Sequence, residues 1–353
     1  MAPPLALELY HAIVQCVDNT GDLLSLALCC SAFRDEAQRY LFCHISPYPE
    51  HRIMRLISTI NASPLRLGPL VYTFCLYEGK HIKSDEKDLQ LISLALRSMC
   101  NLKHFQNRRF LPSTILQGCT FKLHTLGWAA YLDTSSLNFL FCNFLPTQPS
   151  IERLLFYKPC DPFDLAEVPK NLCPMLDFLL AGDNDTIGYL LRDDRLITRL
   201  QWSVIGGGLP TMSVRQLNHL KYLQCVINEL RVPSFTLQLT SLVFLELYLI
   251  KMRPRYLGEL TERLQFLQNL PCLEVLVLDD TYNELFELTP AYQRAFELCP
   301  TLKYIDALVA NKLYARIFPS ENGVFVSNTR THKRDVLAWR REYGVGHMCW
   351  EHV

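Results

Sequence analysis

A repeated L-x-x-L-x-L pattern is the feature of the sequence that most constrains how the chain folds. Its cleanest copy spans residues 273–278 (LEVLVL), and looser copies recur at intervals of 21–31 residues. A unit of this size cannot bury its apolar edge alone, so the pattern predicts that successive units stack into a solenoid. The copies begin at Val71, Leu102, Leu123, Ile151, Met175, Ile197, Leu220, Leu242, Leu273 and Leu302.

The register of the pattern predicts which side chains face outward. Alternate side chains of a strand face opposite ways, so positions four and six point into the solenoid and positions three and five point out. The interval and register are similar to those of leucine-rich repeats. We therefore expect an α/β fold over residues 70–310, an irregular leucine-rich-repeat horseshoe with parallel strands on its concave face and helices on its convex face.

The outward positions, with the position after each copy, form the candidate target-binding face. They mix tyrosine, arginine and both charge signs, as protein-recognition surfaces do. An ordinary solvated sheet is the alternative reading, since tyrosine also favours strands. The candidate residues are His104, Gln106, Arg153, Tyr157, Asp177, Arg199, Gln201, Tyr222, Gln224, Phe244, Glu246, Tyr248, Tyr304 and Asp306.

Several connecting segments have the pattern of amphipathic helices. Residues 85–100 carry one apolar stripe, with acidic residues in the first turn and Arg97 near the end, as the helix dipole favours. Residues 257–267 carry a second stripe, and Thr289-Pro290 is a typical helix start. Residues 47–69 are expected to be a linker with a short helix at 51–61.

The chain before residue 47 has a different, helical pattern. Leu5, Leu9, Ile13 and Val17 recur every four residues, which places them on one helical face. Asp22 is a candidate cap for a second helix that is apolar almost all round. Three short helices cannot bury so apolar a second helix by themselves, so part of it should face a partner or the first repeat.

Residues 1–46 also resemble a known module. Segments 5–13 (LALELYHAI), 22–29 (DLLSLALC) and 33–37 (FRDEA) look like an F-box, and the whole chain resembles fungal-type F-box proteins with a C-terminal leucine-rich-repeat-like solenoid. The family usually has proline where this chain has Ala6. Its usual Cys-Arg pair is also changed, because Cys30 and Ser31 follow Cys29.

The resemblance implies a function. An F-box docks on a Skp-type adapter, which in turn binds a cullin ubiquitin ligase, so the chain would be the substrate receptor that presents an unknown protein target. The adapter-binding residues carried over are Leu5, Leu9, Ile13, Leu23, Leu24 and Leu28. The alternative is a leucine-rich-repeat interaction scaffold unrelated to ubiquitin, whose N-terminal helices serve only as a cap.

The charge balance and the cysteines limit which partners and which cellular compartment we expect for this protein. With 35 Lys+Arg against 35 Asp+Glu, nothing favours a nucleic-acid or membrane partner. The 14 cysteines include no C-x-x-C pair, and neither a secretory signal nor an apolar stretch of about 20 residues is visible. We expect a reduced protein of the cytoplasm, the nucleus or both.

No motif predicts catalysis. The acidic pairs Asp183/Asp185, Asp193/Asp194 and Asp279/Asp280 adjoin repeat strands, where polar turn residues are common. His347, Cys349 and His352 are too few and irregularly spaced for a zinc site. We therefore expect no enzyme, cofactor or metal.

The segment 311–353 should form a C-terminal cap, since a solenoid must cover its last open face. It is expected to contain a strand at 323–326 and a polar helix at 333–342. The outward positions of the cleanest copy are Val275 and Val277, two apolar residues on a mostly polar face. We expect this cap, around Phe325 or Trp339, to cover them, or a target to use them as an anchor.

Overall fold

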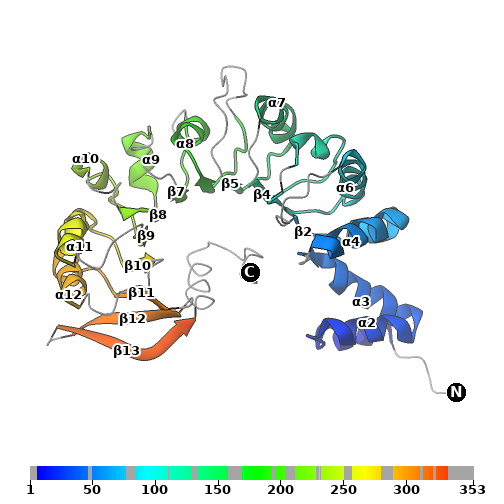
Figure 1. Cartoon of the computed structure of the whole chain (residues 1–353), viewed down its shortest axis with the longest axis horizontal. Coiled ribbons are helices and arrows are strands. Elements are labelled where there is room, and N and C mark those ends of the chain that lie inside the picture. The colour runs from blue at the N-terminus through cyan, green and yellow to red at the C-terminus, as the bar shows by residue number, and fades with distance from the viewer. Residues whose placement is uncertain are drawn as a thin grey trace. The chain divides into compact units, whose positions relative to one another are not determined.

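The structure is a computed structural model that divides into two compact units, Met1–Leu155 with Cys160–Met175, and Phe156–Pro159 with Leu176–Val353. It describes residues 6–46, 50–76, 85–109, 111–128, 133–157, 169, 171–192, 195–202, 211–227, 230, 232–249, 257–279, 289–310, 313–320 and 323–332. Within each unit, parallel strands lie side by side in chain order, and helices line one side of them (Figure 1).

The first unit begins with helices and continues as a parallel sheet of order β1-β2-β3-β4-β5. Its strands are β1 (His44–Ile45), β2 (Thr73–Leu76), β3 (His104–Asn107), β4 (Thr125–Trp128) and β5 (Arg153–Phe156). Its helices are α1 (Leu7–Gln15), α2 (Thr20–Cys29), α3 (Ser31–Cys43), α4 (Glu50–Ala62), α5 (Pro64–Leu67), α6 (Glu86–Ser98) and α7 (Thr134–Asn138). Shorter helical turns are η1 (Gly68–Leu70), η2 (Ser113–Leu116), η3 (Phe139–Phe144) and η4 (Leu145–Thr147).

The second unit has strand order β6-β7-β8-β9-β10-β11-β12-β13. Its strands are β6 (Phe178–Ala181), β7 (Arg199–Trp202), β8 (Tyr222–Val226), β9 (Phe244–Tyr248), β10 (Val275–Asp279), β11 (Tyr304–Ala310), β12 (Leu313–Ser320) and β13 (Gly323–His332). Its helices are α8 (Asn184–Leu190), α9 (Val214–His219), α10 (Pro233–Thr236), α11 (Leu257–Arg263), η8 (Leu264–Asn269) and α12 (Thr289–Leu298).

The predicted register places the strands correctly in every copy but one. Each of these strands begins at the third residue of its copy, and successive strands are paired in parallel at equivalent positions, as with Val275 opposite Phe244 and Tyr304. In the cleanest copy Leu273, Leu276 and Leu278 are fully buried. This one-after-another order is compatible with the predicted stack of repeats.

The copy placed at Met175 was wrong by one residue. Phe178, not Asp177, pairs with Arg199, so the copy begins at Leu176. Leu176 is 4% exposed while Met175 is 62% exposed, because only the former enters the core. Since a one-residue slip moves every side chain to the opposite face, Asp177 leaves the outward row and Phe178 and Leu180 take its place.

The predicted connecting helices are present. Asp85 caps helix α6, since its side chain accepts a hydrogen bond from the Asp88 amide at 2.8 Å, and the helix buries Ile92 and Leu96. The second stripe forms α11 and η8, and α12 begins at Thr289 as expected. The expected helix at 51–61 is α4, which buries Ile53, Ile57 and Ile60 completely.

At Gly68, two helical segments of the first unit, η1 and α6, lie too close together to leave room for a side chain. A Cβ atom at this residue would lie 2.5 Å from the Ser98 carbonyl oxygen, which is backbone at the end of α6. Backbone cannot rotate away as a flexible side chain does, so the junction of η1 with α6 requires glycine.

Gly68→Ala should therefore lower the free energy of unfolding by about 1–3 kcal/mol, the usual cost of overpacking. Urea unfolding followed by circular dichroism measures this change. Gly188→Ala is the control, because its Cβ would meet nothing closer than 3.7 Å within helix α8. That change should raise the stability by about 0.5–1 kcal/mol, since alanine is the better helix former. Equal effects of the two substitutions would contradict the steric explanation.

The end of the second unit is an antiparallel extension of the sheet. Strand β12 pairs with β11, and β13 pairs with β12, both antiparallel. The predicted strand at 323–326 is part of β13, whereas β12 was missed because its sequence, LYARIFPS, has no repeat register. The predicted helix at 333–342 lies outside the described residues.

Val275 and Val277 are 0% exposed, which confirms that they are covered. The two residues expected to cover them are not among the described side chains. In the part of the chain that is described, no helix is long and apolar enough to cross a membrane.

Candidate functional site

The N-terminal helices present two apolar rows to solvent. Leu9 and Ile13 on α1 are 47% and 39% exposed, and Leu24 and Leu28 on α2 are 53% and 87% exposed. Leu23, the fifth described residue of the candidate adapter face, is instead buried inside the module at 8%. The sixth residue, Leu5, lies outside the described residues.

These rows are not needed for the module's own packing. Helix α3 holds α1 through Tyr10 and Phe33, whose rings meet edge to face at 4.7 Å. Val14 and Ala37 are fully buried, and His11 Nδ1 lies 3.0 Å from Glu36 Oε2. We define the exposed side chains of Leu9, Ile13, Leu24 and Leu28 as the apolar helix surface. Large exposed apolar residues at helical spacing on two helices are typical of a protein interface.

Helix α2 begins earlier than the sequence indicated. Its first residue is Thr20, and Asn19 is the cap, with its side chain accepting a hydrogen bond from the Gly21 amide at 2.7 Å. Asp22 therefore lies in the first turn, where its charge favours the helix dipole but does not cap the helix. The prediction of Asp22 as the cap was wrong because Asn19, an equally good capping residue, stands three positions earlier.

The sheet face opposite the helices, called here the helix-free face, carries the predicted target-binding residues. In the first unit His104 is exposed, Arg153 is half-buried and Gln106 is buried, whereas Tyr157, which belongs to the second unit, is half-buried. In the second unit Arg199, Gln201 and Tyr248 are half-buried. Apart from Asp177, which has left the outward row, the other predicted residues are almost fully buried: Tyr222, Gln224, Phe244, Glu246, Tyr304 and Asp306.

In the second unit a network of hydrogen bonds joins the outward residues of β8 and β9. The Tyr222 hydroxyl lies 3.0 Å from Glu246 Oε2, and Gln224 Nε2 donates to the Tyr248 hydroxyl. The rings of Tyr222 and Phe244 are 5.1 Å apart. These side chains bind one another across strands, which the sequence pattern could not reveal because it identifies a face but not what covers it.

Asp306 and Arg316 form a two-point ion pair between β11 and β12. Both guanidinium–carboxylate distances, Nε to Oδ1 and Nη2 to Oδ2, are 2.8 Å, and the guanidinium lies 4.2 Å from the centre of the Tyr304 ring. Burial raises the pKa of the Asp306 carboxyl, and the hydrogen bonds from Arg316 only partly offset this rise. The pair holds the antiparallel extension, so Asp306 is a structural residue and we no longer propose it as a target contact.

Asp177, displaced from the outward row, has a local role. Its Oδ1 accepts a hydrogen bond from the Thr198 hydroxyl at 2.5 Å, and its Oδ2 lies 3.2 Å from Arg199 Nη2. These contacts connect the N-terminal ends of β6 and β7.

A row of alternating histidine and threonine crosses the helix-free face of the first unit. His44 pairs with Thr73, Thr73 with His104, and His104 with Thr125. His44 Nδ1 lies 3.0 Å from the Thr73 hydroxyl, and His104 Nδ1 lies 3.1 Å from the Thr125 hydroxyl. The sequence pattern missed His44 because β1 has only two residues and no leucine register.

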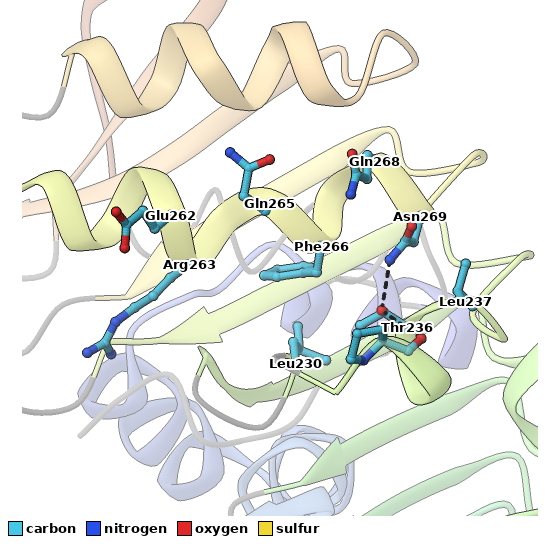
Figure 2. A pocket seen from close by; sticks show the side chains of 10 residues that line it. Leu230, Thr236, Leu237, Glu262, Arg263, Gln265, Phe266, Gln268 and Asn269 are labelled. Atoms are coloured by element: carbon cyan, nitrogen blue, oxygen red, sulfur yellow. Dashed lines mark hydrogen bonds between the residues drawn. The ribbon is translucent and has the colours of Figure 1, made fainter.

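A pocket of about 580 Å³ lies on the helix side of the second unit, next to α10 and η8 (Figure 2). Asn269 donates a hydrogen bond to the Thr236 hydroxyl at 3.1 Å and so ties η8 to α10. Leu230 and Phe266 supply its buried apolar residues, and Glu262 and Arg263 add one charge of each sign. Its described lining has no histidine or cysteine, so the polar groups there are suited to hydrogen bonding.

The acidic residues predicted to be turn residues include a helix cap. Asp183 Oδ1 accepts a hydrogen bond from the Thr186 amide at 2.6 Å at the start of α8. Among the described residues no three His, Cys, Asp or Glu side chains are grouped so that they could hold a metal ion. His347, Cys349 and His352 lie outside the described residues.

No model of a known protein family matches this chain, and no curated protein matches it in sequence.

Proposed function

We propose that this protein is a non-enzymatic substrate receptor that recruits a Skp-type adapter, and through it a cullin, by means of its N-terminal helices. The observation that carries the proposal is the apolar helix surface, where four aliphatic side chains stay exposed although the module packs without them. Burying each against a partner is favourable by about 1 kcal/mol or more, in proportion to the area covered. A protein target would then bind the accessible part of the helix-free face.

The resemblance of residues 5–37 to an F-box gives the kind of partner. Leu9, Ile13, Leu24 and Leu28 are at positions that the resemblance assigns to the adapter contact, and all four are exposed. Ala6 and the Cys30–Ser31 pair depart from the family pattern at or beside the helix starts, and Cys30 precedes α3 without a side-chain capping bond. These departures from the family pattern do not change any of the four exposed residues.

Replacing two residues of the apolar helix surface should abolish adapter capture. Full-length protein with Leu24→Asp and Leu28→Asp would place two charges in the contact, whose burial without partners costs several kcal/mol. Affinity capture of a purified Skp-type adapter by the full chain, followed by quantification of the bound adapter, measures the effect. We expect capture by the unaltered protein and none by the double variant.

Leu65→Asp is the matched control, because Leu65 on α5 is 94% exposed and lies outside the three-helix module. It should leave capture unchanged. If the folded, unaltered chain captures no adapter, the receptor function is refuted and the scaffold function remains.

A further inference from the structure

The His–Thr row is defined by His44, Thr73, His104, Thr125 and Arg153. The first four are paired in strand register. Arg153 takes the equivalent place on β5, since its amide bonds the His124 carbonyl oxygen just as the Thr125 amide bonds that of Lys103. Side chains in register on adjacent strands lie on the same face, so these five residues form a line across the sheet.

The two threonines in this line are buried, and the two histidines are exposed to solvent. Thr73 is 2% exposed and Thr125 7% exposed, whereas His44 and His104 are exposed and Arg153 is half-buried. Each threonine hydroxyl is within hydrogen-bond distance of a histidine Nδ1. Among the described residues, no hydrogen bond occupies Nε2 of His44 or His104.

This pairing makes each histidine a hydrogen-bond donor in both of its protonation states. When the ring is neutral, the threonine hydroxyl can donate to Nδ1, which leaves the proton on Nε2. When the ring is protonated, Nδ1 donates to the threonine oxygen and Nε2 still carries a proton. With the Arg153 guanidinium, the line offers three donor groups to an acceptor.

The spacing of these donors is set by the sheet. Neighbouring strands are about 4.8 Å apart, so donors on alternate strands are about 9.6 Å apart. A polyproline II segment has three residues per turn and rises about 3.1 Å per residue, so every third side chain falls on one face at about 9.3 Å intervals. An extended β-strand, with a same-face interval of about 6.6 Å, does not match.

The surrounding charge also favours an anionic partner. Arg153 belongs to the row and Lys103 precedes His104 in the chain, while the carboxylate of Glu152 lies 3.4 Å from His124 Nδ1. We propose that the His–Thr row binds an extended acidic segment of a partner protein, in polyproline II conformation, with carboxylates at every third residue. This inference rests on the proposed function only in that it gives the chemistry of the target segment.

A pair of peptides with the same composition tests the spacing. One fluorescein-labelled peptide repeats Glu-Pro-Pro three times, and the other has the same three glutamates together between two runs of proline. Fluorescence anisotropy with the full chain at low salt should show affinity at least about tenfold higher for the spaced peptide, because it alone can reach three donors at once. Equal affinities, or no binding of the spaced peptide, would overturn the proposal.

Variants locate the binding. His104→Leu and Arg153→Gln should each weaken binding of the spaced peptide by about tenfold, since each removes one hydrogen bond to a charged group. His219→Leu, at an exposed histidine in the second unit, is the control and should have no effect. If neither His104→Leu nor Arg153→Gln weakens binding while circular dichroism shows both folded, the row is not the site.

Two more measurements separate the possible outcomes. A single-stranded oligonucleotide that binds as tightly as the spaced peptide would mean a general polyanion surface, against the proposal. Capture of the adapter by His104→Leu should be normal. If the unaltered chain captures the adapter normally but binds the spaced peptide weakly, this inference alone is rejected. If the unaltered chain binds the spaced peptide but captures no adapter, the receptor function alone is rejected.

The pH dependence has a definite sign. Burial, followed by the charges of His124, Arg153 and His44, holds the pKa of His104 below its ordinary value of 6.5, and Glu152 opposes them. His104 therefore gains its charge at a lower pH than a histidine with the ordinary pKa of 6.5. Affinity for the spaced peptide should rise as the pH falls below that value, and should not rise in His104→Leu to the same extent.

Discussion

Asp306→Asn should lower the free energy of unfolding by about 3 kcal/mol, the low end of the cost of breaking a buried ion pair. Asp306 is 1% exposed and Arg316 keeps only 16% of its side chain exposed. Asparagine has nearly the same shape, but it would leave the guanidinium in this place without a negative partner. We expect a loss of stability at the low end of this range because part of the Arg316 side chain is still exposed to water. Chemical denaturation of the full chain at neutral pH measures the difference.

The control is the double variant Asp306→Leu with Arg316→Met. It removes both charges together, and replacing a whole buried pair with apolar residues is often neutral or stabilising. We therefore expect it to recover most of the stability that Asp306→Asn loses. A double variant that is less stable than Asp306→Asn would show that the ion pair itself, rather than the unpaired charge, determines the effect.

Trp202→Ala should cost about 3–5 kcal/mol, the range for removing a large aromatic side chain from a core. Trp202 is fully buried at position six of its copy, with its ring 6.2 Å from that of Phe235. Its Nε1 donates a hydrogen bond to Asn184 Oδ1 at 2.9 Å, which joins β7 to the start of α8. The loss combines a cavity with an acceptor left without its donor, and thermal and chemical unfolding both report it.

Trp128 provides a matched comparison for the hydrogen bond. It occupies position six of its own copy and is 1% exposed, but in the described part of the structure its Nε1 has no hydrogen-bond partner. Phenylalanine at either position keeps an aromatic ring and removes the N–H group. Trp202→Phe should therefore destabilise more than Trp128→Phe, by about 1 kcal/mol. The opposite order would mean that the Asn184 contact adds nothing to stability.

Much of the backbone could be predicted from the sequence because the repeat pattern indicates which side chains point into the core and which point out. Where leucine recurs at positions one, four and six, as in 273–278, the strand and its buried face both follow. The pattern failed at β6, because Met175 and Leu176 are adjacent apolar residues and either can start a copy. Only the pairing of Phe178 with Arg199 decides between them.

The candidate site was less predictable for a related reason. A period of two separates inward from outward residues, but it does not say whether an outward residue meets solvent, as His104 does, or another strand's side chain, as Tyr222 does. His44 was missed because a two-residue strand carries no periodicity. Its role depends on Thr73, 29 residues away in the sequence.

The antiparallel extension has a consequence for assembly. A stack of parallel repeats ends in a strand whose amide and carbonyl groups can template another chain, and such edges promote fibre growth. Here β12 occupies that edge of β11 and reverses direction, so a further repeat cannot add in the same sense. The number of repeats in the second unit is thus limited by its own C-terminal strands. A chain cut after residue 310 would instead expose the edge of β11, the last parallel strand, and should self-associate.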